Sequence, residues 1–131
     1  MPQFTLEPPT APTPGFLQTI RMSEQGKQVG AATWHAAHDT SDGVVQIVEF
    51  QITPEIRRRG HGKRLLAAML EQWRVYHTTR KTPLRSAWVM LRHKRHVIAR
   101  AFFLSEGFNH IGTIKDVLDG EDALVYVRTF N

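Results

Sequence analysis

A buried strand, a basic loop with two glycines and an amphipathic helix follow one another in residues 44–76, and this order constrains the fold most. Residues 44–52 form an apolar, β-branched run, which predicts a buried strand. Apolar residues then recur at helical spacing, at Leu65, Leu66, Met69, Leu70, Trp73 and Tyr76. Gly60 and Gly62 stand where this helix begins. The segment therefore predicts a helix whose N-terminus lies just beyond a buried strand.

The loop between strand and helix has the chemistry of a pyrophosphate cradle. Residues without a Cβ atom let a ligand approach the backbone closely. The first N–H groups of a helix have no partner inside it and carry partial positive charge. Basic side chains surround this opening: Arg57, Arg58, Arg59, Lys63 and Arg64. The chain therefore predicts an anion site here, and the alternative is a basic helix start that only faces solvent.

The spacing of the glycines excludes two common phosphate-binding motifs. The P-loop pattern Gly-x-x-x-x-Gly-Lys-Ser/Thr is absent, and Leu65 breaks the dinucleotide pattern Gly-x-Gly-x-x-Gly. What remains is Arg57-x-x-Gly60-x-Gly62, preceded by Ile52 and Pro54. This pattern resembles the acyl-CoA pyrophosphate loop of the GNAT superfamily, the acetyl-CoA-dependent N-acyltransferases.

A second region carries the same resemblance independently. Residues 87–91 read as a strand and 97–105 as a helix ended by Gly107, followed by Phe108. This is similar to the family segment Asn-x-x-Ala-x-x-Phe/Leu-Tyr-x-x-x-Gly-Phe. Two residues depart from it: His96 stands where Asn is usual, and Phe103 where Tyr is common.

The remaining chain predicts strands at 4–6, 16–22, 29–36, 109–114 and 123–130. Together with the resemblance, this implies an α+β, GNAT-like fold: a mixed, mainly antiparallel sheet flanked by helices. Residues 1–15 form a Pro-rich N-terminal segment and 16–131 the acyltransferase domain. The helices that family members usually carry between their first two strands are missing. We therefore expect an acceptor site that is open, or one completed by a second subunit in a homodimer.

Composition fits a small enzyme. The 131 residues carry a net charge of +5 and no cysteine, which excludes disulfides and thiolate metal sites and is typical of cytoplasmic proteins. No apolar run is long enough to span a membrane, and no metal-ligand pattern is present. Nucleic-acid binding through residues 57–64 and 92–100 is the least favoured interpretation, because few aromatic residues alternate with the basic ones.

The resemblance implies an N-acetyltransferase that moves an acetyl group from acetyl-CoA directly to a primary amine. Arg57, Arg58, Arg59, Gly60, His61, Gly62 and Lys63 would hold the pyrophosphate. The backbones of Phe50 and Ile52 would align the pantetheine arm, Phe103 would pack near the thioester, and His96 would lie at the mouth of the site. The alternative is a binding module that holds acyl-CoA with little catalysis, which the absence of the usual Tyr suggests.

The general base is the least constrained part of the site. Glu49 is the only carboxylate of the central strand 44–52. Strict alternation groups Gln46, Val48, Phe50 and Ile52 on one face and Ile47, Glu49 and Gln51 on the other. A β-bulge would re-aim Glu49 toward the site; otherwise it is a solvent-facing side chain. His93, His96 and Tyr126 remain candidates for the general acid, and Trp34, Trp73 and Trp88 are expected in the core.

Overall fold

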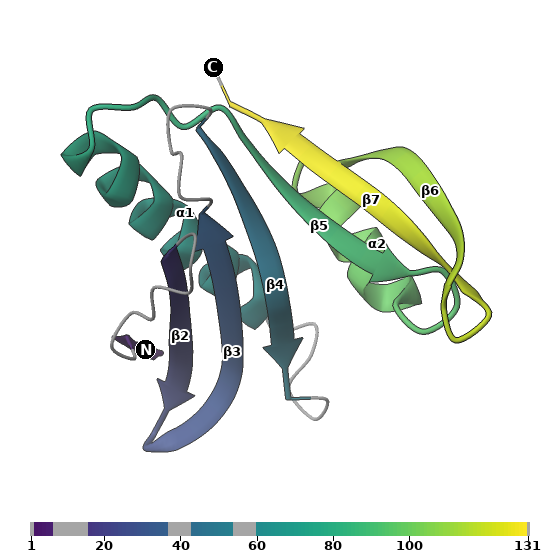
Figure 1. The fold of residues 1–131 in the computed structure, drawn as a ribbon. Coiled ribbons are helices and arrows are strands. Elements are labelled where there is room, and N and C mark those ends of the chain that lie inside the picture. Colours follow the sequence, from purple (N-terminus) through teal and green to yellow (C-terminus); the bar gives the residue numbers. More distant parts are fainter. Residues whose placement is uncertain (1, 7–15, 37–42, 54–59, 131) are drawn as a thin grey trace.

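The computed structural model describes residues 2–6, 16–36, 43–53 and 60–130 of the chain. Nine elements follow one another (Figure 1). They are β1 (Gln3–Leu6), β2 (Phe16–Glu24), β3 (Lys27–Ala36), β4 (Val44–Ile52), α1 (His61–Thr79), β5 (Ser86–Arg92), α2 (Val97–Ser105), β6 (Asn109–Leu118) and β7 (Glu121–Thr129). The predicted bounds of β4 and α2 are confirmed, and β6 runs four residues beyond its prediction.

All seven strands form one sheet in the order β1-β2-β3-β4-β5-β7-β6. Neighbouring strands are antiparallel except β4 and β5, which run parallel. Their register joins Val44–Ile47 to Ser86–Val89, and beyond it the two ribbons diverge (Figure 1). The predicted mixed, mainly antiparallel fold is therefore confirmed, with a sheet that opens between its two central strands.

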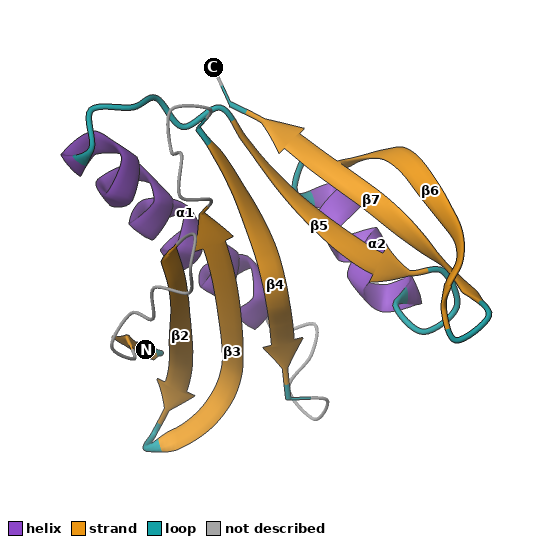
Figure 2. Cartoon of the chain, viewed as in Figure 1, coloured by secondary structure: helices purple, strands orange, loops and turns teal. Residues whose placement is uncertain are grey.

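Both helices cover the same face of the sheet (Figure 2). On β3, Trp34 meets Trp73 of α1, with ring centroids 6.5 Å apart. On β4, Phe50 meets Phe103 of α2, with centroids 5.4 Å apart. Trp34 and Phe50 lie on one face, because the strand partners Ile47 and Ala32 are buried with them. Within the described residues, no helix covers the opposite face.

The apolar stripe of α1 explains its burial. Buried side chains recur at helical spacing at Leu65, Leu66, Met69, Trp73 and Tyr76, whereas Leu70 is only partly buried. The helix α2 ends where Gly107 adopts φ +90°, a conformation that favours glycine, and the next N–H, of Phe108, donates to the carbonyl of Phe103. The sequence patterns that predicted both helices are therefore confirmed.

Some expectations need correction or fall outside the described chain. Trp34 and Trp73 are core residues, but Trp88 is partly exposed, so its assignment to the core was wrong. The predicted strand at 4–6 is β1, at the edge of the sheet. The division into segments 1–15 and 16–131 stays a prediction. No helix among the described residues has the length and apolar character needed to cross a membrane.

Candidate active site

The N-terminus of α1 is open. Gly60 precedes the helix with φ 82° and ψ 5°, and a Cβ atom built on it would meet nothing within 4 Å. Its carbonyl accepts the first helical hydrogen bond, from the Arg64 N–H, at 3.1 Å. The first turn contains no acidic residue, and no described residue accepts a hydrogen bond from the N–H groups that precede Arg64. This end of α1 therefore presents partial positive charge to whatever approaches it.

The predicted cradle residues point in different directions. Lys63 is exposed, whereas His61 is 3% exposed and lies with Nε2 3.0 Å from Oε2 of Glu24 on β2. Gly62 faces inward, because a Cβ atom there would lie 3.3 Å from the ring of Phe102. Three further predicted residues, Arg57, Arg58 and Arg59, lie outside the described residues.

Strand β4 carries a β-bulge at Val48. Ile47 lies opposite Trp34 and Glu49 lies opposite Thr33, so the residue between them on β4 has no counterpart on β3. A bulge inserts one extra residue and turns the side chains that follow it to the other face. The bulge that was considered for this strand is therefore present.

The bulge changes which side chains share a face. Val45 and Ile47 are buried before it, and Phe50 and Ile52 pack against the same core after it. The strict alternation that groups Gln46 with Phe50 and Ile52 is therefore wrong. The polar residues of β4 share the face opposite the helices: Gln46, Glu49 and Gln51. Glu49 is thus aimed away from the helices.

An aromatic cluster fills the space between β4 and α2. Phe50 stacks on Phe102 with ring centroids 5.4 Å apart and meets Phe103 edge-on at the same distance. Phe103 also contacts Phe108 at 5.1 Å and is only 1% exposed. The position where the family commonly carries Tyr is therefore surrounded by aromatic rings.

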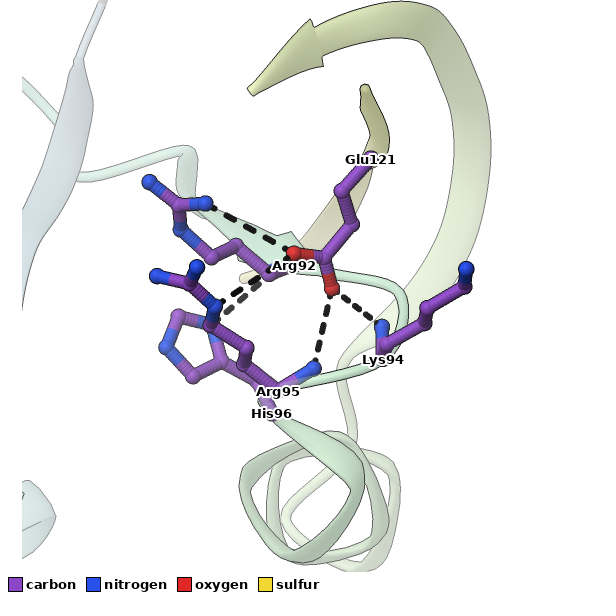
Figure 3. A network of polar contacts seen from close by, with 5 residues as sticks. All are labelled: Arg92, Lys94, Arg95, His96 and Glu121. Atoms are coloured by element: carbon purple, nitrogen blue, oxygen red, sulfur yellow. Dashed lines mark hydrogen bonds and ion pairs between the residues drawn. The ribbon is translucent and has the colours of Figure 1, made fainter. Parts of the chain in front are cut away.

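Glu121 organises the loop between β5 and α2 (Figure 3). Its Oε1 accepts hydrogen bonds from the backbone N–H groups of Lys94 and Arg95, and its Oε2 lies 3.6 Å from Nη1 of Arg92 and 3.8 Å from Nε of Arg95. Burial alone would raise the pKa of this carboxyl. The backbone hydrogen bonds from Arg95 and Lys94, together with Arg92, outweigh burial and hold the pKa below its usual range.

His96 lies immediately before α2 and accepts a hydrogen bond on its imidazole ring. Its Nδ1 accepts from the backbone N–H of Arg92 at 2.8 Å, so in the neutral ring the proton resides on Nε2. Burial, Arg92 and Arg95 lower the pKa of His96, and Glu121 opposes them. A lowered pKa favours the uncharged imidazole at neutral pH. His96 is thus suited to donate one hydrogen bond from Nε2 rather than to supply positive charge.

The structure brings some predicted site residues together and reveals a missed one. Phe50 and Phe103 are in contact, whereas His96 precedes the first residue of α2. The role of Glu121 was not predicted from the sequence, because its hydrogen-bond partners Arg95 and Lys94 are 26 and 27 residues away. Among the described residues, no group of three His, Asp or Glu side chains could hold a metal ion.

A family model described as an acetyltransferase (GNAT) domain matches residues 18–110. A search of curated proteins found no significant match. The structure of the ribosomal-protein-S18-alanine N-acetyltransferase from Escherichia coli is 20% identical in sequence, with a TM-score of 0.67, and the match covers 85% of this chain and 67% of that one.

Two further solved structures have the same fold. An IAA acetyltransferase from Bacillus cereus is 15% identical, with TM-score 0.72, and the match covers 88% of this chain and 78% of that one. The structure of a protein from Bacillus anthracis, described as a streptothricin acetyltransferase in complex with acetyl coenzyme A, is 16% identical in sequence, with a TM-score of 0.73. The match covers 90% of this chain and 64% of that one. Because the family model spans more than half of the chain, the protein belongs to the GNAT acetyltransferase family, a family of acyltransferases.

Proposed function

We propose that this protein transfers an acetyl group from acetyl-CoA directly to a primary amine, with both substrates bound at once. The observation that carries the proposal is the open N-terminus of α1. This helix follows β4, the strand that carries the bulge and whose pairing with β5 ends at Ile47. A structure of the same fold that contains acetyl coenzyme A supports the choice of donor.

The residues present fit a CoA pyrophosphate. The first-turn N–H groups of α1 would donate to the phosphate oxygens, with Lys63 and the basic residues 57–59 adding charge. Gly60 leaves the approach clear, since nothing lies within 4 Å of its missing Cβ. After Ile47, β4 no longer pairs with β5. The edge of β4 that faces β5 around Phe50 and Ile52 is therefore suited to align the amides of the pantetheine arm.

The chemistry requires one bond to form and one to break. The amine nitrogen uses its lone pair to attack the thioester carbonyl carbon, and the C–S bond then breaks with its electron pair leaving on sulfur. A backbone N–H of β4 near Phe50 would stabilise the oxyanion. Glu49, exposed at the bulge, would take the proton from the ammonium, directly or through water.

The leaving group needs little help. A thiol with a pKa of about 8.5 leaves readily as a thiolate and takes its proton from solvent. Phe103 has no proton to give, and its side chain is buried among other aromatic rings. A second candidate function is a module that holds acyl-CoA with little catalysis, and the observation for it is the absence of a proton donor at Phe103. Measuring CoA release with a panel of amines separates the two candidates. A second subunit that completes the acceptor site stays a prediction.

Calorimetric titration with acetyl-CoA tests the donor site. The test variant is Gly60→Glu, and Gly120→Glu is a matched control, because Gly120 also has a positive φ (75°) and open space around its missing Cβ. Both substitutions should cost about 1–2 kcal/mol of stability through backbone strain. Only Gly60→Glu should abolish acetyl-CoA binding. If the wild-type protein binds neither acetyl-CoA nor CoA, the proposed function fails.

A further inference from the structure

The helix-free face of the sheet exposes Glu49 and Gln51, on the part of β4 that lies beyond its register with β5. Both helices, and with them the open N-terminus of α1, lie on the other face. The pairing of β4 with β5 ends at Ile47 and Val89, and the unpaired stretch beyond these two residues is the opening between the two strands. A donor that approaches along α1 leaves only the helix-free face for the acceptor.

The strand registers define which side chains line that face. His35 on β3 lies opposite Gln46 on β4, and Gln46 lies opposite Trp88 on β5. The neighbours of these residues along each strand, including Trp34 and Ile47, point to the buried side. Trp88 is partly exposed, and the next residue on its face, Met90, is 37% exposed. One side of the opening is therefore apolar.

The other side of the opening carries a negative charge. Glu49 is the only carboxylate on β3, β4 and β5, it is exposed, and it has no hydrogen bond or ion pair with any described residue. Two other carboxylates near this end of the sheet already have partners: Glu24 contacts His61, and Glu121 accepts a hydrogen bond from the β5–α2 loop. On β3, β4 and β5 as the structure describes them, Glu49 is thus the carboxylate available to an incoming cation.

We propose that the acceptor is a small primary amine with an apolar, preferably aromatic, body, a specification that rests on the proposed function. Its ammonium group lies against Glu49 and its body lies on Trp88 and Met90. The arrangement combines a carboxylate with an aromatic surface, which together favour an arylalkyl ammonium over a purely aliphatic one. A free amino acid is disfavoured, because its carboxylate would lie beside Glu49, and Arg92, the cation that follows Met90 on this face of β5, is already paired with Glu121.

Steady-state acetylation of three matched amines tests this. We expect 2-phenylethylamine to exceed ethylamine, which lacks the ring, and phenylalanine, which adds a carboxylate, by at least tenfold in kcat/KM. Trp88→Leu should raise KM for 2-phenylethylamine at least tenfold and remove its advantage over ethylamine. Val127→Ala is the control, because Val127 lies opposite Trp88 on the far side from β4 and should leave the selectivity unchanged. Chemical denaturation verifies that each variant is folded; Trp88→Gln, which also removes the aromatic ring, replaces a variant that is not.

The outcomes separate the inference from the function on which it rests. Equal acetylation of the three amines, acetylation of peptides alone, or unchanged selectivity in the Trp88 variants overturns the acceptor class. Acetyl-CoA binding with turnover of any amine would leave the proposed function standing in those cases. No binding of acetyl-CoA in the calorimeter overturns both.

Discussion

Replacing Phe103 with tyrosine adds the hydroxyl that the family commonly carries at this position, and the structure predicts that it destabilises the free protein. Phe103 is 1% exposed and contacts Phe50, Phe102 and Phe108. A hydroxyl buried without a hydrogen-bond partner costs about 1–3 kcal/mol. With a urea m-value of about 2 kcal/mol per molar, the unfolding midpoint should fall by about 0.5–1.5 M.

The control for this prediction is Phe130→Tyr. Phe130 is only partly buried, so its added hydroxyl can reach water, and the stability should stay within about 0.5 kcal/mol of wild type. Urea unfolding followed by tryptophan fluorescence measures both variants without ligand. If Phe103→Tyr is as stable as Phe130→Tyr, the para position of Phe103 is not in an apolar interior. The argument that the thiolate leaves without a protein acid would then lose its structural support.

Two further predictions concern the loop between β5 and α2. Glu121→Gln should lower the thermal midpoint at pH 7 more than at pH 3. Because the folded-state pKa of Glu121 is lowered, its carboxylate stabilises the fold above the unfolded-state pKa of about 4.3. This stabilisation is lost as the pH falls through the folded-state pKa. An equal loss at both pH values contradicts this. His96 also has a lowered pKa, so stability should fall as the pH drops from about 6.5 toward its folded pKa, since the unfolded chain binds the proton first. His96→Asn should remove this part of the pH dependence in denaturation series between pH 5 and 7, and an unchanged series would refute it.

Local patterns predicted most of the fold. Residues 44–52 and 97–105 were predicted with the bounds that the structure has, because a β-branched run and a helical apolar stripe depend on neighbours close in the chain. The pairing of strands follows from the order of elements that the resemblance implies. The extension of β6 to Leu118 was missed, because its register with β7 is irregular after Ile114 and Asp116 has a positive φ.

Contacts between distant segments were not predictable in the same way. His61 stands in a basic, glycine-containing stretch, and nothing in that stretch shows that its ring is buried against Glu24, 37 residues earlier. Glu121 likewise carries no local sign that it accepts hydrogen bonds from the backbone of the β5–α2 loop. Both depend on how the sheet brings its strand ends together. A single sequence therefore predicts the open helix N-terminus but not which of its side chains face it.

The bulge at Val48 lies between these two cases. Apolar residues that reach the core stand at positions 45, 47, 50 and 52, and polar ones at 46, 49 and 51. Spacings of two, three and two residues cannot fit one face of a regular strand. The sequence pattern therefore indicates an extra residue at position 48. Strict alternation hides it by grouping Gln46 with Phe50. One inserted residue thus turns Glu49 to the face that carries Trp88, and both the base and the acceptor class depend on it.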